Sequence, residues 1–254
     1  MATAPGGRAL IIHHDANSLG GIVVDYLRHQ RFVLDERWIT PPGQPDIPGD
    51  FSRVGKLDPH DLPALIVVLG SGHSVYEPAV QHWVQPELDL LRATDIAGVP
   101  TLGICFGHQM LAAAHGATVA ATRHPEIGWF EVEPESNAPI DRGPWFQWHL
   151  DHAELPNGAE ALAWSPSGLQ AFRLRSNIGV QFHPELDEPV LTAWVDTDRH
   201  WLVEHEHQPE HLLAETRRTA AEARQRSINQ FDQILTNFGF GLDSKPVERE
   251  VSPT

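Results

Sequence analysis

The most reactive side chain in the sequence is the single cysteine, Cys105. It lies in the segment GICFGHQ (103–109), which follows an apolar run and precedes an alanine-rich helical pattern. This pattern is typical of a nucleophile elbow, a sharp strand-to-helix turn in which neighbouring glycines, here Gly103 and Gly107, relieve crowding. The N–H groups at the start of the following helix would face the sulfur and favour its thiolate form. The segment therefore predicts a cysteine nucleophile.

A cysteine nucleophile needs a base, and the base needs a group that orients it. The segment GVQFHPE (179–185) offers both, because a short apolar strand ends at His183 and Glu185 follows two residues later. Side chains two residues apart in an extended chain point to the same side, and Pro184 favours an extended His183. We therefore expect His183 to serve Cys105 as the base while Glu185 holds the imidazole. The alternative is a buried structural thiol and a surface turn, but two such segments at strand ends favour catalysis.

These residues need a scaffold that brings distant segments together, and the hydrophobic pattern predicts one. Apolar strands alternate with amphipathic helices in the first half of the chain, which is typical of parallel βαβ units. We expect an α/β fold, a doubly wound and mostly parallel sheet with helices on both faces, plus a small antiparallel β part within 129–172. Ligands bind at the carboxyl ends of strands in such sheets, where Gly70, Cys105 and His183 would meet. The predicted strands cover residues 9–12, 32–38, 64–69 and 100–105, and the predicted helices cover 22–29, 87–97 and 110–115.

A chain of 254 residues is long enough for one domain with a good core. We expect residues 1–242 to form this domain, including a C-terminal helix at about 209–238 whose apolar stripe packs on the rest. The same stripe could instead be a docking face for a partner. The polar segment 243–254 contains two prolines and is expected to be a disordered tail.

The composition argues against several classes of function. The chain carries 18 basic and 34 acidic residues, a net charge of −16, which disfavours binding to nucleic acid or to an anionic membrane. Its 16 histidines are scattered and no HExxH or paired CxxC motif occurs, so we expect no metal and no cofactor. The clusters at 13–15 and 205–207 are better explained as a strand end and a helix edge. One cysteine, no signal-peptide stretch and no apolar run of transmembrane length predict a cytoplasmic protein.

Several segments between about Ala9 and Val195 together resemble the class I (triad-type) glutamine amidotransferase domains. Within that family the chain is most similar to stand-alone members related to the amidotransferase domain of GMP synthetase. The resemblance implies a flavodoxin-like fold for nearly the whole folded part. The order and spacing of the motifs are specific, and the matching segments are VVLGSGHSVY (67–76), GVPTLGICFGHQ (98–109), PEIGW (125–129), FQWHLD (146–151), QAFR (170–173) and GVQFHPE (179–185).

The resemblance also implies the chemistry of the site. Cys105 would attack the side-chain amide of glutamine, His183 would take the thiol proton and return it to the leaving ammonia, and Glu185 would orient the imidazole. A γ-glutamyl thioester would form and be hydrolysed to glutamate. Backbone N–H groups would hold the developing oxyanion. The other implied site residues are Gly70, Gly72 and Phe106 for the oxyanion, and Gln109, His149 and Asp151 for the substrate.

Two positions differ from the family pattern. Many members read Gly-Gly-Pro where this chain has Gly70-Ser71-Gly72, which leaves open which amide of the loop contacts the oxyanion. Leu150 stands where a small residue is common, and a leucine there would narrow the substrate pocket or change its specificity.

Two enzymatic functions fit these residues. The first is a glutaminase that passes ammonia to a partner synthetase, because the chain contains neither a GxxxxGK loop nor an SGGxDS-type pyrophosphate loop. The alternative is a stand-alone γ-glutamyl peptidase or hydrolase, which uses the same triad if the pocket opens beyond the amide nitrogen. A non-enzymatic binding protein is disfavoured because Cys105, His183 and Glu185 are all intact. An esterase with a related elbow is disfavoured because its acid usually precedes its histidine in the chain, whereas Glu185 follows His183.

Overall fold

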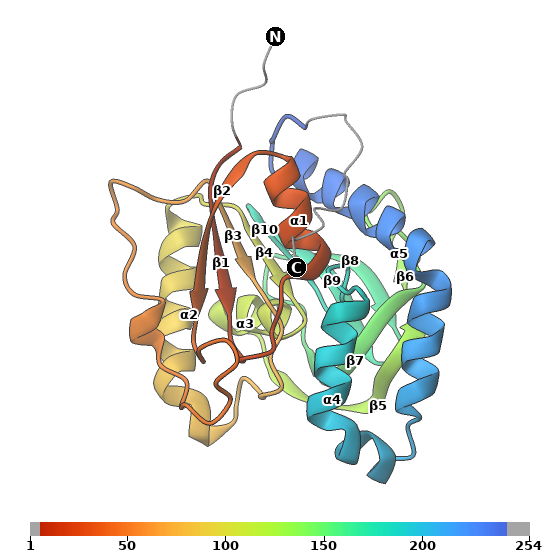
Figure 1. Ribbon diagram of the computed structural model, residues 1–254. Coiled ribbons are helices and arrows are strands. Elements are labelled where there is room, and N and C mark those ends of the chain that lie inside the picture. The colour runs from red at the N-terminus through yellow and green to blue at the C-terminus, as the bar shows by residue number, and fades with distance from the viewer. Residues whose placement is uncertain (1–5, 243–254) are drawn as a thin grey trace.

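The computed structural model describes residues 6–242 as a layered α/β structure (Figure 1). Its main sheet has eight strands in the order β2-β1-β3-β4-β10-β9-β8-β6. The first five strands pair in parallel, and the last three continue the sheet in antiparallel pairing. Their bounds are β1 (Gly7–His13), β2 (Phe32–Trp38), β3 (Leu65–Val68), β4 (Thr101–Ile104), β6 (Glu133–Pro134), β8 (Glu160–Ser165), β9 (Gly168–Leu174) and β10 (Asn177–Val180).

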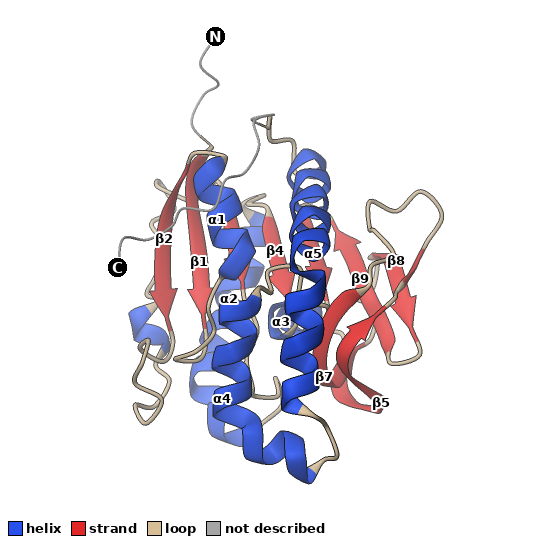
Figure 2. Cartoon of the chain, turned by 45° about the vertical axis from the view of Figure 1, so that its right-hand side comes forward, coloured by secondary structure: helices blue, strands red, loops and turns tan. Residues whose placement is uncertain are grey.

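The central strands are apolar on both faces because helices cover both faces (Figure 2). Successive side chains of β1 show this: Ala9 and Ile11 belong to one core, and Leu10 and Ile12 belong to another. The first core includes residues of α1 and α5, and the second includes residues of α2 and α3. The predicted doubly wound, mostly parallel sheet is therefore confirmed. The helices are α1 (Gly21–His29), α2 (Gln81–Ile96), α3 (Phe106–Ala114), α4 (Glu188–Glu204) and α5 (Pro209–Asn237), with short turns η1 (Phe51–Arg53) and η2 (Pro78–Val80).

A separate two-stranded antiparallel sheet joins β5 (Val119–Phe130) to β7 (Trp145–Ala153). It is the small antiparallel part expected from the sequence, and β5 begins ten residues before the predicted region. Helix α4 packs on this sheet through a third core that contains Phe146 and Val190. The sequence pattern did not reveal α4, although Asp187 caps its first turn by accepting a hydrogen bond from the Val190 N–H at 3.0 Å.

Helix α5 lies where the C-terminal helix was expected, and its apolar side contacts the rest of the chain. Leu213 belongs to the core around α4, while Phe231 and Ile234 belong to the core around α1. The Tyr26 hydroxyl of α1 also donates a hydrogen bond to Asp232 at 2.5 Å. The predicted tail at 243–254 lies outside the described residues. Among residues 6–242, the helices are too short or too polar to cross a membrane.

Candidate active site

Cys105 occupies a strained turn between β4 and α3. Its backbone has φ 53° and ψ −106°, a left-handed φ that residues with a side chain rarely adopt. The glycines on either side are required by space. A Cβ atom on Gly103 would lie 2.4 Å from the carbonyl oxygen of Gly107, and one on Gly107 would lie 2.1 Å from the carbonyl oxygen of Val68. The strand and the helix are therefore pressed together at the point where the thiol emerges.

Replacing Gly107 with alanine is expected to destabilise the fold, because the new methyl group would overlap the backbone of β3. Overpacking against backbone typically costs 1–3 kcal/mol, and we expect the free energy of unfolding to fall by roughly 3 kcal/mol. Urea denaturation measures this change. Gly241→Ala is the matched control, since nothing lies within 4 Å of its added Cβ. Equal stability of the two variants would contradict the crowding at the elbow.

His183 follows β10 and forms a buried pair with Glu185. The imidazole Nδ1 lies 2.7 Å from Glu185 Oε1, and the two side chains are 3% and 2% exposed. Burial by itself lowers the pKa of His183, but the carboxylate of Glu185 and the sulfur of Cys105 outweigh burial and raise the pKa to about 10. Glu185 and Cys105 therefore favour the protonated imidazole, and the carboxylate of Glu185 holds the ring in one orientation.

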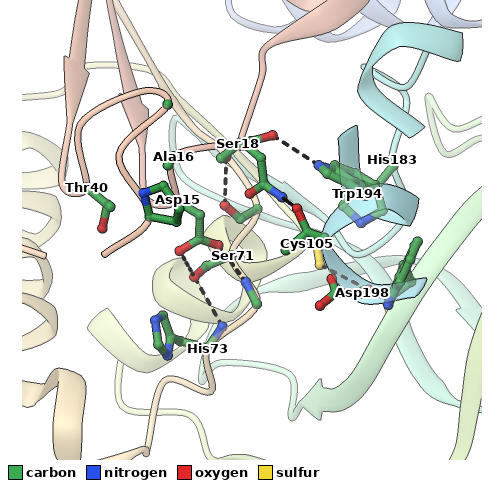
Figure 3. A pocket seen from close by; sticks show the side chains of 17 residues that line it. Asp15, Ala16, Ser18, Thr40, Ser71, His73, Cys105, His183, Trp194 and Asp198 are labelled. Carbon is green, nitrogen blue, oxygen red and sulfur yellow. Dashed lines mark hydrogen bonds between the residues drawn. The ribbon is translucent and has the colours of Figure 1, made fainter. Parts of the chain in front are cut away.

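Cys105 and His183 meet beside Gly70. A Cβ atom on Gly70 would lie 3.3 Å from His183 Cε1 and 3.7 Å from Cys105 Cβ, so both side chains flank the same small residue. Both also line a cavity of about 460 Å³ (Figure 3). Cys105 Sγ lies 3.8 Å from the carbonyl oxygen of Trp148. Nε2 of His183 is buried and has no hydrogen-bond partner among the described residues, which leaves it available to a substrate.

The glycine loop after β3 (70–72) is held in place by hydrogen bonds to the segment that follows β1. The Gly70 carbonyl accepts a hydrogen bond from Ser18 Oγ at 3.0 Å, and the ring of His14 lies 3.3 Å from the same oxygen. The Gly72 N–H donates to Asp15 Oδ2 at 2.7 Å. This contact differs from the role expected for Gly72, because an N–H that is bonded to Asp15 is not available to an oxyanion. Gly70 and Gly72 both line the cavity, but the Gly72 N–H is bonded to Asp15 there.

A second buried histidine–carboxylate pair, which the sequence did not reveal, supports this loop. His14 Nε2 lies 3.1 Å from Glu87 Oε1, and both side chains are fully buried. Burial alone lowers the pKa of His14, but Glu87 outweighs it and raises the pKa. The neighbouring His13 lies 3.2 Å from Glu36 and stacks on Trp38. The two histidines at the end of β1 therefore pair with carboxylates of other elements.

The three residues expected around the substrate form a buried network that does not line the cavity. Gln109 Nε2 donates to Gln181 at 3.2 Å, and His149 Nε2 lies 3.1 Å from Glu126. Asp151 accepts hydrogen bonds from two hydroxyls that follow the glycine loop, at 2.5 and 2.9 Å. These donors are Ser74 and Tyr76.

Leu150 and Phe106 are the two remaining residues to which the sequence assigned an effect on the site. Leu150 is 44% exposed and is not part of the wall, so it does not narrow the cavity as expected. Phe106 opens α3 directly after Cys105, and its side chain packs on His14 with ring centroids 4.8 Å apart. Its N–H is the first of the helix and has no acceptor within that helix.

Comparisons with known proteins agree with this geometry. The family model for glutamine amidotransferase class-I matches residues 51–190, more than half of the 254 residues. The chain is 37% identical over 132 residues to a glutamine-hydrolyzing GMP synthase of Mycolicibacterium paratuberculosis, a match that covers 49% of this chain and 24% of the synthase. It is 27% identical over 169 residues to gamma-glutamyl peptidase 4 of Arabidopsis thaliana, covering 59% of this chain and 63% of the peptidase.

A solved structure extends the similarity to the whole fold. The crystal structure of a glutamine amidotransferase from Thermotoga maritima matches with a TM-score of 0.78 and 27% identity, covering 91% of this chain and 99% of that one. Together with the family match, this confirms the predicted enzyme class, a cysteine amidohydrolase of the amidotransferase type. The chain belongs to the class-I glutamine amidotransferase family.

Proposed function

We propose that this protein hydrolyses the side-chain amide of glutamine and of related γ-glutamyl compounds. Cys105 is the nucleophile, His183 is the base and Glu185 orients the imidazole. The observation that carries the proposal is the convergence of Cys105 and His183 beside Gly70 on one cavity, with Glu185 2.7 Å behind the ring. A strained elbow, a buried base and its carboxylate are the parts that covalent catalysis by a thiol needs.

The reaction follows from the charge state of His183. His183 takes the proton of the Cys105 thiol onto Nε2, and the resulting thiolate attacks the amide carbon and forms a C–S bond. As the C–N bond breaks, His183 gives its proton from Nε2 to the leaving nitrogen. The neutral imidazole then takes a proton from water, which hydrolyses the γ-glutamyl thioester and releases glutamate. Glu185 stabilises the imidazolium at both stages.

We propose that two backbone N–H groups hold the oxyanion. The first is that of Phe106, at the positive end of α3. The second is that of Ser71, because a trans peptide points its N–H opposite to its carbonyl, and the Gly70 carbonyl points toward Ser18. We propose that Ser71, rather than Gly72, supplies the loop donor. Asp151 then acts indirectly, by holding the segment after this loop through Ser74 and Tyr76.

Two fates of the released nitrogen are supported by different observations. Similarity to GMP synthases, of which the chain spans about a quarter, supports a partner synthetase that receives ammonia. Similarity to gamma-glutamyl peptidase 4, together with a cavity of about 460 Å³, supports a γ-glutamyl peptidase or hydrolase. The single free thiol favours action in a reducing compartment, and we propose the cytoplasm.

A substrate panel on the purified chain tests the function and separates these two fates. Release of glutamate is measured from glutamine, from γ-glutamyl dipeptides and from glutathione. A higher kcat/KM on glutamine supports the amidotransferase role, and a higher value on the dipeptides supports the peptidase. If folded protein releases glutamate from none of these compounds, the proposed function is wrong.

The pH dependence of the reaction is expected to report His183. Above the pKa of about 10 the imidazolium is lost, so kcat/KM is expected to fall on that alkaline side. Glu185→Gln removes the charge that raises the pKa while burial remains, so the alkaline limb is expected to move to lower pH by about one unit or more. A pH–rate profile of both proteins checks this. If the alkaline limb of the Glu185→Gln profile stayed at the wild-type pH, Glu185 would not be the group that raises the pKa of His183.

The raised pKa of His183 also affects the stability of the fold. The pKa of His183 in the folded chain, about 10, lies above the value of about 6.5 expected when the chain is unfolded. Its protonation therefore stabilises the fold fully below pH 6.5, and this contribution is lost as the pH rises through about 10.

A further inference from the structure

The cavity beside Cys105 is larger than the release of ammonia requires. Its volume is about 460 Å³, whereas a molecule the size of water or ammonia occupies about 30 Å³ in a liquid. Beyond Cys105 and His183, the wall is formed by the loops after β1, β2 and β3, by Trp148 of β7 and by α4. This volume is typical of a site for a small organic ligand. The cavity also has to hold the γ-glutamyl part of the substrate, and a volume typical of small organic ligands admits a substituent on the leaving nitrogen as well.

The part of the cavity next to His183 is the side where the leaving nitrogen must lie. In the proposed mechanism Nε2 of His183 protonates that nitrogen, and this atom is buried without a hydrogen-bond partner among the described residues. Trp194 of α4 packs edge-on against the imidazole with centroids 4.8 Å apart, and its Nε1 donates to the Asn17 carbonyl at 3.3 Å. Trp194 thus fixes α4 against the loop after β1 and forms an apolar wall directly beyond the base.

Two carboxylates, Asp15 and Asp198, line the same cavity. Asp15 comes from the loop after β1, and Asp198 comes from the kink of α4, where its backbone has φ −108° and ψ 15°. Both side chains line this one cavity, and burial raises the pKa of Asp198, with the charge of Asp15 raising it further. Neither lysine nor arginine lines the cavity in the described part of the chain. His73, which does line it, lies 2.9 Å from Glu77.

We infer that the preferred substrate is a γ-glutamyl amide whose leaving group is a cationic amine, such as the mono-amide of a short diamine. This rests on the proposed function and names its substrate class. The methylene chain of the diamine lies against Trp194, and its distal ammonium lies between Asp15 and Asp198, where a cation relieves the repulsion of the two carboxylates. An anionic leaving group, such as an amino acid with a free carboxylate, is repelled by the same wall.

The chemical step is the one proposed above and balances in the same way. The C–S bond to Cys105 forms, the C–N bond breaks, and the proton of His183 passes to the nitrogen that was part of the amide. The free diamine leaves, and water then hydrolyses the thioester to glutamate. No further reactant is required.

Three amides of matched length separate charge from size: γ-glutamyl-butylamide, γ-glutamyl-(4-aminobutyl)amide and γ-glutamyl-4-aminobutyrate. The wild-type chain is expected to favour the aminobutyl amide over the butylamide by roughly tenfold in kcat/KM, and the carboxylate is expected to be the poorest of the three. Equal rates, a preference for the carboxylate, or glutamine as much the best substrate would overturn the inference and leave the proposed function intact. No hydrolysis of any γ-glutamyl compound would overturn the proposed function itself.

A matched pair of variants on α4 assigns the preference to the acidic wall. Asp198→Asn is expected to reduce the ratio of the aminobutyl amide to the butylamide to roughly a third or less of the wild-type ratio. Asp196→Asn is the control, because Asp196 is exposed, lies 3.7 Å from Arg199 and does not line the cavity. An unchanged ratio in Asp198→Asn, or an equal loss in both variants, would overturn the role of this wall. The wild-type comparison stands even if a variant does not fold.

Discussion

Replacing Cys105 with alanine is expected to lower kcat/KM for any γ-glutamyl substrate by at least about 10⁴-fold, because the only thiol in the chain is removed. Among the described residues that line the cavity, the hydroxyl-bearing side chains are Ser18, Thr40, Ser71 and Thr197, and an alcohol is a weaker nucleophile than a thiol. The fold is expected to survive, since alanine is smaller than cysteine and the strain at φ 53° depends on the backbone rather than on sulfur. Glutamate release measures the activity, and thermal unfolding of both proteins measures the fold.

The control for this experiment is a substitution elsewhere on the same helix. Ala113 lies on α3 away from the thiol, and Ala113→Ser is expected to keep most of the activity. Turnover by Cys105→Ala within tenfold of wild type would refute the nucleophile and, with it, the proposed mechanism.

Replacing His183 with alanine is expected to lower kcat/KM at pH 7 by about 10³-fold. The variant loses both the cation that faces the sulfur and the proton that the leaving nitrogen needs. Its remaining activity is expected to rise with pH, because hydroxide can then generate the thiolate that His183 no longer favours. A pH–rate profile from pH 6 to 10 measures both effects.

His200→Ala is the matched control, because His200 lies on α4, is 86% exposed and pairs with Glu204 at 3.2 Å. It is expected to behave as the wild type at every pH. If His183→Ala kept full activity at pH 7, or if both histidine variants lost activity to the same extent, His183 would not be the base.

The elbow is the part of the site that sequence predicts best, because its requirements are local. A strand, two glycines around Cys105 and a helix all lie within residues 101–114, and the contacts of Gly103 and Gly107 are those that such a turn demands. The pair of His183 and Glu185 is local as well, since two residues in an extended segment separate them. Its placement beside Cys105 follows from the parallel order of β4 and β10.

The support beneath the glycine loop is hidden from sequence because its partners are distant along the chain. His14 is 56 positions from Gly70 and 73 positions from Glu87. A histidine at a strand end could pair with any carboxylate that the fold brings near, so the motif at 13–15 alone does not name Glu87. The hydrogen bond from Gly72 to Asp15 could not be predicted for the same reason, and because of it we propose Ser71 in place of Gly72 as the oxyanion donor.

Two helices show where local signals mislead. Helix α2 begins at Gln81, six residues before its predicted start, because Pro86 within it suggests a break. Helix α4 is kinked at Asp198 and buries only four of its seventeen residues, so its apolar period is too weak to detect. Missing α4 matters more for function than the shifted start of α2, since α4 contributes Trp194 and Asp198 to the cavity wall.

The central claim, that Cys105 is a nucleophile activated by His183, is tested most directly by mapping the covalent adduct of a glutamine-directed electrophile. Protein treated with 6-diazo-5-oxo-norleucine is digested and analysed by mass spectrometry, alongside His183→Ala. One adduct is expected, on the peptide that contains Cys105, and it is expected to form at least about tenfold faster in the wild type. An adduct on another residue, no adduct on folded protein, or equal rates in both proteins would contradict the central claim.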